Sequence, residues 1–175
     1  MFSGIVEGKG ELISVRGHES VSNKSSGMRI RVKWGCLLSS DVKIGDSISV
    51  NGVCLTVVES DPEWFEADIS GETLSKTVGL DKLGFVNLEK ALRYSDRIGG
   101  HLVTGHVDGI AHIVMIKSID NSKKIDILIP LSFGKFITEK GSIALNGVSL
   151  TVNTVEDVHD GCLISVNLVP HTWST

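Results

Sequence analysis

The chain contains nearly the same seven residues twice. Asn51–Val57 reads Asn-Gly-Val-Cys-Leu-Thr-Val, and Asn146–Val152 reads Asn-Gly-Val-Ser-Leu-Thr-Val. Other landmarks recur in the same order: Met1–Gly8 is similar to Leu102–Gly109, and Glu72–Ser75 is similar to His171–Ser174. The two copies each take up about half of the chain, and units of that length can fold as separate small domains, whereas a solenoid needs at least three short repeats. The sequence therefore predicts a duplicated domain, whose copies differ most clearly in the thiol of Cys54 and the hydroxyl of Ser149.

The composition is that of a compact globular protein. Of the 175 residues, 41% are hydrophobic and 22% are charged, which suits one or two modest cores. The net charge of −4 gives no electrostatic reason to expect nucleic acid or an anionic membrane as a partner. The first residues do not read as a signal peptide and no apolar run approaches the ~20 residues of a membrane span, so we expect a cytoplasmic protein. Cys36, Cys54 and Cys162 are odd in number and lack paired metal-ligand spacing, which favours free thiols over disulfides or zinc.

Short alternating segments rich in branched residues predict β-strands. These segments are Ser47–Asn51, Leu55–Val58, Trp64–Ile69, Phe85–Glu89, Ile125–Ile129 and Leu163–Leu168. Asn51-Gly52 and Asn146-Gly147 predict tight hairpin turns, because both residue types tolerate the positive φ that such turns require. Only short helices are expected, around Cys36–Val42, Glu72–Thr77 and Leu131–Thr138.

Many short antiparallel strands in so small a unit favour a closed barrel, because closure removes exposed strand edges. Polar residues and a glycine pair in Tyr94–Gly100 mark the boundary between the copies. We therefore predict an all-β protein with an N-terminal domain at 1–97 and a C-terminal domain at 98–175.

Cys54 and two histidines are the candidates for chemistry. An arbitrary cysteine is most often a small packed residue, but Cys54 follows a turn and its duplicate is Ser149, so we favour slightly a role in a pocket. His101 and His106 either are incidental at the entry to a strand or serve in proton transfer and hydrogen bonding to a heteroaromatic ring. Zinc is weakly supported, because no third ligand follows at a recognisable spacing.

Two further features have competing interpretations. Asp68–Thr73 is either a strand end with a helix cap or a ligand-contact loop, and its recurrence as Asn167–Thr172 favours the loop. Lys140 is either a solvated turn charge or a ligand contact. The sequence contains no glycine-rich phosphate loop, nucleophile elbow or metal signature.

Together, three motifs closely resemble the riboflavin synthases of the alpha-chain type, in the lumazine-binding repeat family. They are the opening Met-Phe-Ser-Gly-Ile-Val-Glu-Gly, the duplicated Asn-Gly-Val-(Cys/Ser)-Leu-Thr-Val and the central Gly-Gly-His-Leu-Val-Thr-Gly-His-Val. The resemblance runs from Met1 to Thr175 and implies two similar six-stranded antiparallel Greek-key β-barrels, each binding one lumazine. It also implies a homotrimer, with the catalytic site between barrels of different subunits, and an association with lumazine synthase.

The resemblance implies a transferase reaction. Two molecules of 6,7-dimethyl-8-ribityllumazine dismutate to riboflavin and 5-amino-6-(D-ribitylamino)uracil, with no metal or organic cofactor. Matching the family's motifs residue by residue places the catalytic neighbourhood at Cys54, His106, Ser47 and His101, whose individual roles stay open. The implied substrate-binding positions lie in both repeats and are Gly4, Ile5, Val6, Cys54, Leu55, Thr56, Asp68, Ile69, Ser70, Gly71, Glu72, Thr73, Gly105, His106, Val107, Lys140, Ser149, Leu150, Thr151, Asn167, Leu168, Val169, Pro170, His171 and Thr172.

The second repeat departs from the family's pattern. Asn146 stands where some members have an acidic residue, and His171 stands where others have a glutamate opposite Glu72. The second repeat has no counterpart to Phe85–Glu89, so we expect an incomplete second barrel without the helix through which the family's trimers associate.

Two other functions remain open: a non-catalytic lumazine or flavin antenna protein of the same fold, and a generic flavin-binding β-barrel that serves a redox partner. Cys54 and the two histidines argue against the antenna protein, and the duplication argues against the generic barrel.

Overall fold

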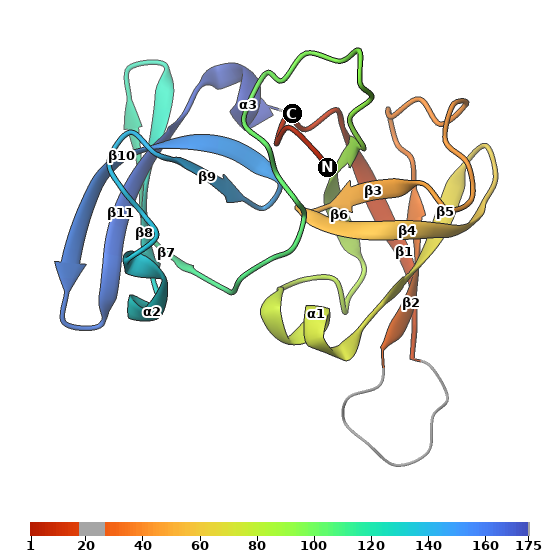
Figure 1. Ribbon diagram of the computed structural model, residues 1–175, viewed down its shortest axis with the longest axis horizontal. Helices are drawn as coiled ribbons and strands as arrows, with labels where there is room; N and C mark the ends of the chain where they lie inside the picture. Colours follow the sequence, from red (N-terminus) through yellow and green to blue (C-terminus); the bar gives the residue numbers. More distant parts are fainter. Residues whose placement is uncertain (18–26, 175) are drawn as a thin grey trace. The chain divides into compact units, whose positions relative to one another are not determined.

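The computed structural model describes residues 1–17 and 27–174, which form two compact units (Figure 1). Unit 1 comprises Met1–Gly109 and Asn146–Val148, and unit 2 comprises Ile110–Leu145 and Ser149–Thr175. The division of the sequence into repeats at 1–97 and 98–175 stays a prediction. The predicted all-β class is confirmed, since strands dominate both units.

Unit 1 is a closed six-stranded antiparallel barrel in the order β1-β2-β5-β4-β3-β6 (Figure 1). Its strands are β1 (Gly8–Gly17), β2 (Met28–Lys33), β3 (Ser47–Val50), β4 (Val53–Ser60), β5 (Trp64–Ile69) and β6 (Gly84–Lys90). β6 closes the barrel because it pairs with β1 along one edge and with β3 along the other. The predicted closed barrel is confirmed for this unit.

Alternation along the strands fills the barrel. On β4, Val53, Leu55 and Val57 are buried in the core, and the residues between them face away from it. Trp34 and Phe65 stack in the same core with ring centroids 4.4 Å apart. Burying a large apolar side chain contributes about 1.5–3 kcal/mol, so this core is the main source of stability for the unit.

The two Asn-Gly turns have the predicted geometry. Asn51 and Gly52 have φ values of 50° and 86°, and Asn146 and Gly147 have values of 52° and 83°. Positive φ at both central residues is the type I′ arrangement, which matches the twist of a hairpin. The turn at Asn51 therefore fixes the register in which Cys54 pairs opposite Ser49.

Two of the three predicted helices form: α1 has the expected length and begins one residue earlier, and α2 is shorter than expected. α1 (Gly71–Lys76) begins where the Ser70 hydroxyl accepts a hydrogen bond from the amide of Thr73 at 3.1 Å. α2 (Leu131–Gly134) lies within the predicted Leu131–Thr138. The helix expected around Cys36–Val42 is wrong, because separate turns form instead: Leu37 N–H bonds to the Trp34 carbonyl and Val42 N–H to the Ser39 carbonyl.

Unit 2 is a five-stranded antiparallel sheet in the order β7-β8-β11-β10-β9. Its strands are β7 (His112–Ile119), β8 (Ser122–Ile129), β9 (Ser142–Leu145), β10 (Val148–Val158) and β11 (Gly161–Leu168), and α3 (Pro170–Ser174) follows them (Figure 1). The order repeats that of the first five strands of unit 1. Between β11 and residue 174 the chain forms α3.

The core of unit 2 lies on β8, β10 and β11. Ile125, Ile127, Val152, Ile164 and Val166 are among its buried members. The helices in the part of the chain that the structure describes are all too short to cross a membrane.

Candidate functional site

The outer face of the β3–β4 hairpin carries a row of polar side chains. Opposite residues of an antiparallel pair lie on the same face of the sheet, so the pairs Ser47–Thr56 and Ser49–Cys54 share one face. Ile48, Val50, Leu55 and Val57 take the other face and fill the core. The structure thus brings together the predicted residues Ser47, Cys54 and Thr56 outside the barrel.

Cys54 lies directly against Gly105. The amide of Cys54 donates a hydrogen bond to the Gly105 carbonyl at 2.9 Å. Gly105 has φ +81°, and a Cβ added there would lie 2.6 Å from the Cys54 Cβ. Only glycine permits this approach, because a side chain would clash with the backbone and strain the left-handed conformation. His106 and Val107 follow Gly105 directly in the sequence, so their backbone begins at this contact with Cys54.

The N-terminal segment, Phe2–Ile5, lies alongside the segment that carries His101. Phe2 and Val103 exchange two backbone hydrogen bonds of 2.8 and 3.0 Å, and the His101 amide donates to the Ser3 carbonyl at 3.0 Å. Gly4 has φ +75°, so the chain turns there. The residues that lead into the predicted Gly4–Val6 therefore pair with the segment that carries the predicted His101.

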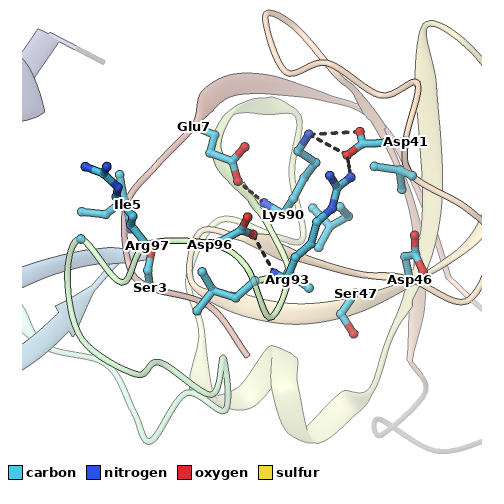
Figure 2. Close-up of a pocket in the computed structure, with 15 residues that line it drawn as sticks. Ser3, Ile5, Glu7, Asp41, Asp46, Ser47, Lys90, Arg93, Asp96 and Arg97 are labelled. Atoms are coloured by element: carbon cyan, nitrogen blue, oxygen red, sulfur yellow. Dashed lines mark hydrogen bonds and ion pairs between the residues drawn. The ribbon is translucent and has the colours of Figure 1, made fainter.

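A pocket of about 640 Å³ opens where this N-terminal segment meets the start of β3 (Figure 2). The predicted residues Ile5 and Ser47 line it, together with Ser3 and the apolar Ile48 and Leu92. Its charged lining consists of Glu7, Asp41, Asp46, Lys90, Arg93, Asp96 and Arg97. Carboxylates, cationic groups and hydroxyls together suit a neutral ligand that is rich in hydroxyl groups. Such a ligand can donate hydrogen bonds to the carboxylates and accept them from the cationic groups.

The charged groups of the pocket are tied to one another (Figure 2). Lys90 Nζ lies 3.1 Å from Asp41 Oδ1, and the Arg93 guanidinium also pairs with Asp41. The Lys90 hydrogen bond, helped by the positive charge of Arg93, holds the pKa of Asp41 below its ordinary value. Asp96 accepts from the Arg93 amide at 2.7 Å, and Glu7 accepts from the Lys90 amide at 2.8 Å. These contacts order the segment that follows β6.

Asp68, at the end of β5, is held by Arg29. The two side chains form parallel hydrogen bonds of 2.8 Å each, a bidentate geometry that fixes the carboxylate. The bond to Asp68 raises the pKa of Arg29, which therefore stays charged. Ser70 caps α1 in the same loop, so Asp68–Thr73 is both a helix start and an ordered polar loop.

Unit 2 holds its predicted residues on three elements. Ser149 and Thr151 lie on β10, Asn167 lies near the end of β11, and His171 lies in α3. Lys140 lies in a turn with φ +63°, and its amide donates to the Val152 carbonyl at 2.8 Å. This set therefore comes from two strands, a turn and a helix of unit 2.

Some predicted residues pack into or against a core. Leu55 and Ile69 are buried in the core of unit 1, while Leu150 and Leu168 pack against the core of unit 2. The described residues contain no cluster of three His, Cys, Asp or Glu side chains that could hold a metal ion. All three cysteines are free thiols, and burial raises the pKa of Cys162.

The repeated architecture has a counterpart in a known family. The family model for the lumazine binding domain matches the chain twice, over residues 3–91 and 104–175. The chain belongs to the lumazine-binding domain family. Its two matches contain the two Asn-Gly hairpins, with Cys54 in one and Ser149 in the other. His101 falls between the matched segments.

Members of this lumazine-binding family with curated names are similar over nearly the whole chain. Riboflavin synthase of Photobacterium phosphoreum is 41% identical over 174 residues, covering 98% of this chain and 75% of the relative. Riboflavin synthase of Bacillus subtilis is 39% identical over 177 residues, covering 99% and 77%. Among solved structures, LumP complexed with 6,7-dimethyl-8-(1'-D-ribityl) lumazine is 27% identical with a TM-score of 0.79, covering 100% of this chain and 90% of that one.

The structure also adds residues that the sequence analysis did not select. Ser49 and Glu89 are buried polar residues on β3 and β6, and Glu89 pairs directly across from Ser49. Asp41, Lys90 and Arg93 join in the pocket although they are far apart in sequence. The alternation of Phe85–Glu89 already places Glu89 on the outer face, but only the fold brings it to the N-terminal segment.

Proposed function

We propose that this chain is a riboflavin synthase, which transfers a four-carbon unit between two molecules of 6,7-dimethyl-8-ribityllumazine. The observation that carries the proposal is the pair of lumazine-binding repeats, at 3–91 and 104–175, in a chain 37–41% identical to riboflavin synthases. One substrate molecule donates and the other accepts. Two similar but unequal sites, distinguished by Cys54 and Ser149, meet that requirement.

The chemistry asks for positioning and modest acid–base catalysis. The reaction consumes two lumazines and gives riboflavin and 5-amino-6-(D-ribitylamino)uracil, so no outside oxidant or cofactor is needed. A proton on the 7-methyl group is acidic because the resulting anion delocalises into the ring, and a moderate base suffices to remove it. Holding the two rings together lowers the entropic cost of the bimolecular step.

Residues on the outer face of unit 1 supply the proposed catalytic groups. Cys54 offers a nucleophile or hydrogen-bond partner, His106 and His101 offer imidazoles that can accept or donate a proton, and Ser47 offers a hydroxyl. The remaining predicted positions in unit 1, from Gly4 to Val6 and from Asp68 to Thr73, are proposed to bind substrate. The equivalent positions in unit 2 are Lys140, Ser149–Thr151 and Asn167–Thr172, whose hydroxyls and amides suit the ring and the ribityl chain.

Assembly and location are part of the proposal. We expect a homotrimer in the cytoplasm, with the reacting pair held between barrels of different subunits and with lumazine synthase as an associated protein. Its support is the family resemblance of the sequence. Sedimentation over a dilution series, with initial rates on the same samples, tests the trimer, because activity that needs assembly falls as the chain dissociates.

The alternative is an antenna protein that binds lumazine without turnover. The likeness to LumP with bound lumazine favours it, but its identity of 27% is lower than the 41% to a riboflavin synthase. Incubation with 6,7-dimethyl-8-ribityllumazine separates the two functions. A synthase forms riboflavin absorbance and fluorescence, and an antenna protein leaves the bound lumazine unchanged.

A further inference from the structure

Glu89 is a buried carboxylate with unusual partners. Its side chain is on β6, and only 3% of the residue is exposed. Oε1 accepts hydrogen bonds from the Ser3 amide at 2.6 Å and the Ser3 hydroxyl at 2.7 Å, and Oε2 accepts from the Gly4 amide at 3.1 Å. A buried carboxylate is costly unless cations or several donors stabilise it. Here all three donors belong to two consecutive residues of the N-terminal segment.

The contacts of Glu89 lock a segment that has few other anchors. Phe2 is tied to Val103, and Ser3 accepts from His101, but the amides of Ser3 and Gly4 bond only to Glu89 among the described contacts. Hydrogen bonds to an ionised acceptor are about twice as strong as neutral ones. Glu89 therefore sets where the chain turns at Gly4 and how Ile5 enters the pocket wall in Figure 2.

The same carboxylate lies in line with Cys54. Strand pairing places Glu89 opposite Ser49, and Ser49 opposite Cys54, so the three residues form one row across β6, β3 and β4. Phe2 of the N-terminal segment and Cys54 both lie against Gly105, because a Cβ at Gly105 would lie 3.0 Å from Phe2 Cε2 and 2.6 Å from Cys54 Cβ. Glu89 is thus coupled to the candidate catalytic neighbourhood through one short, packed stretch of chain.

We infer that Glu89 is a positioning residue, which holds Phe2–Ile5 in the conformation that completes the lumazine site. The inference rests on the proposed function for its catalytic consequence, but the anchoring itself does not. Glu89 touches no substrate and transfers no proton. Its carboxylate keeps the segment ordered before substrate binds, so that the substrate does not have to order it.

Glu89→Gln tests the inference with little change of shape. A carboxamide offers one acceptor oxygen in place of two, and its NH2 group must then face an N–H donor. Amide hydrogen exchange at Ser3 and Gly4 should accelerate by at least about tenfold, the amount expected when a hydrogen bond to a charged group is lost. If the segment is then ordered about a tenth of the time, KM and the lumazine Kd should each rise by about tenfold.

Glu66→Gln is the matched control. Glu66 is another buried carboxylate, 1% exposed, but its partners are arginines on β1 and β2, with Arg31 Nε at 2.8 Å. This variant should lose stability without faster exchange at Ser3 and Gly4 and without a change in KM. Partial unfolding lowers the amount of active protein and hence the apparent kcat, whereas loss of positioning raises KM.

The outcomes are decisive. Unchanged exchange at Ser3 and Gly4 in folded Glu89→Gln would overturn the anchoring, and fast exchange with unchanged KM and Kd would overturn the positioning role. If the unaltered protein converts no lumazine, the proposed function fails, while the exchange rates still report on the anchor. Ser3→Ala, which removes only the hydroxyl donor, should give a smaller increase in exchange at the same amides.

Discussion

Gly105 is the position where one added methyl group should disturb the site most. In Gly105→Ala the new Cβ would lie 2.6 Å from the Cys54 Cβ and 2.8 Å from the Cys54 amide nitrogen. Ordinary carbon contacts are about 3.5–4.0 Å, and the Cys54 backbone is fixed within the β3–β4 hairpin, so the overlap cannot be relieved by a rotamer change. The methyl group therefore has to push Cys54 and Gly105 apart.

Two costs add in this variant. The left-handed conformation at φ +81° costs an alanine about 1–2 kcal/mol. Forcing an extra carbon into a packed site costs about 1–3 kcal/mol more. We expect a total loss of about 2–5 kcal/mol from the free energy of unfolding, which lowers the urea midpoint by roughly 1–3 M.

Gly79→Ala separates the two costs. Gly79 has φ +87°, close to that of Gly105, but its added Cβ would meet only the flexible Lys82 Cε at 4.0 Å. This control should lose only the conformational part, about 1–2 kcal/mol. Both variants can be unfolded in urea while Trp34 and Trp64 report on unit 1, in a Trp173→Phe background that removes the tryptophan of unit 2.

Equal losses in the two glycine variants would refute the close approach of Gly105 to Cys54. A larger loss in Gly105→Ala than in Gly79→Ala, together with weaker lumazine turnover, would support it.

Further predictions address the other groups. Cys54→Ala should lower kcat far more than it lowers lumazine affinity. Ser149→Ala should mainly weaken lumazine binding at one class of sites, by about 1–3 kcal/mol if a buried hydrogen bond is lost. Titration and kinetics that show equal effects in both variants would contradict these two predictions. His106→Gln should keep lumazine binding but flatten the limb of the pH–rate profile set by imidazole ionisation, and an unchanged profile would return His106 to a structural role. Because Lys90 lowers the folded-state pKa of Asp41, Asp41 stabilises the fold above its unfolded pKa of about 3.9, and this stability is lost as the pH falls through the lower folded pKa. Asp41→Asn should therefore be less stable than the unaltered chain near neutral pH, and urea midpoints measured on acidification should converge; a constant gap would exclude the ion pair as the cause.

Local signals in the sequence predicted the hairpins and several strands well. Asn51-Gly52 and Asn146-Gly147 favour positive φ locally, so the turn type and the place of Cys54 just after it could be predicted from two neighbouring residues. Trp64–Ile69 was predicted with the bounds that β5 has. The duplication adds the relation between the copies, whose five common strands have the same order.

Strands that depend on distant contacts were missed. β1 begins with Gly8 and Gly10, residues that locally argue against a strand. A Cβ at Gly10 would lie 2.6 Å from the Lys33 carbonyl oxygen, so glycine is needed there for a close approach to β2. The mistaken helix at Cys36–Val42 has a similar origin, since Leu37 is drawn into the barrel core while Leu38 is left 77% exposed.

Some contacts of the candidate site could be predicted from local sequence, and others depend on distant contacts. Cys54, Ser47 and Thr56 could be placed on one face from strand periodicity and the turn alone. Glu89 could not be linked to Ser3, or Asp41 to Lys90 and Arg93, because those partners are separated by long stretches of chain. Only the closed barrel brings them together.

The most direct test of the proposed function is the stoichiometry of conversion. The purified chain is incubated with 6,7-dimethyl-8-ribityllumazine alone, with no added metal or cofactor. The remaining lumazine and the two products are quantified by chromatography as the reaction proceeds. We expect one riboflavin and one 5-amino-6-(D-ribitylamino)uracil for every two lumazines consumed, with Cys54→Ala much slower at saturating substrate. Lumazine that binds and is recovered unchanged at every protein concentration would contradict the proposed function and favour the antenna protein.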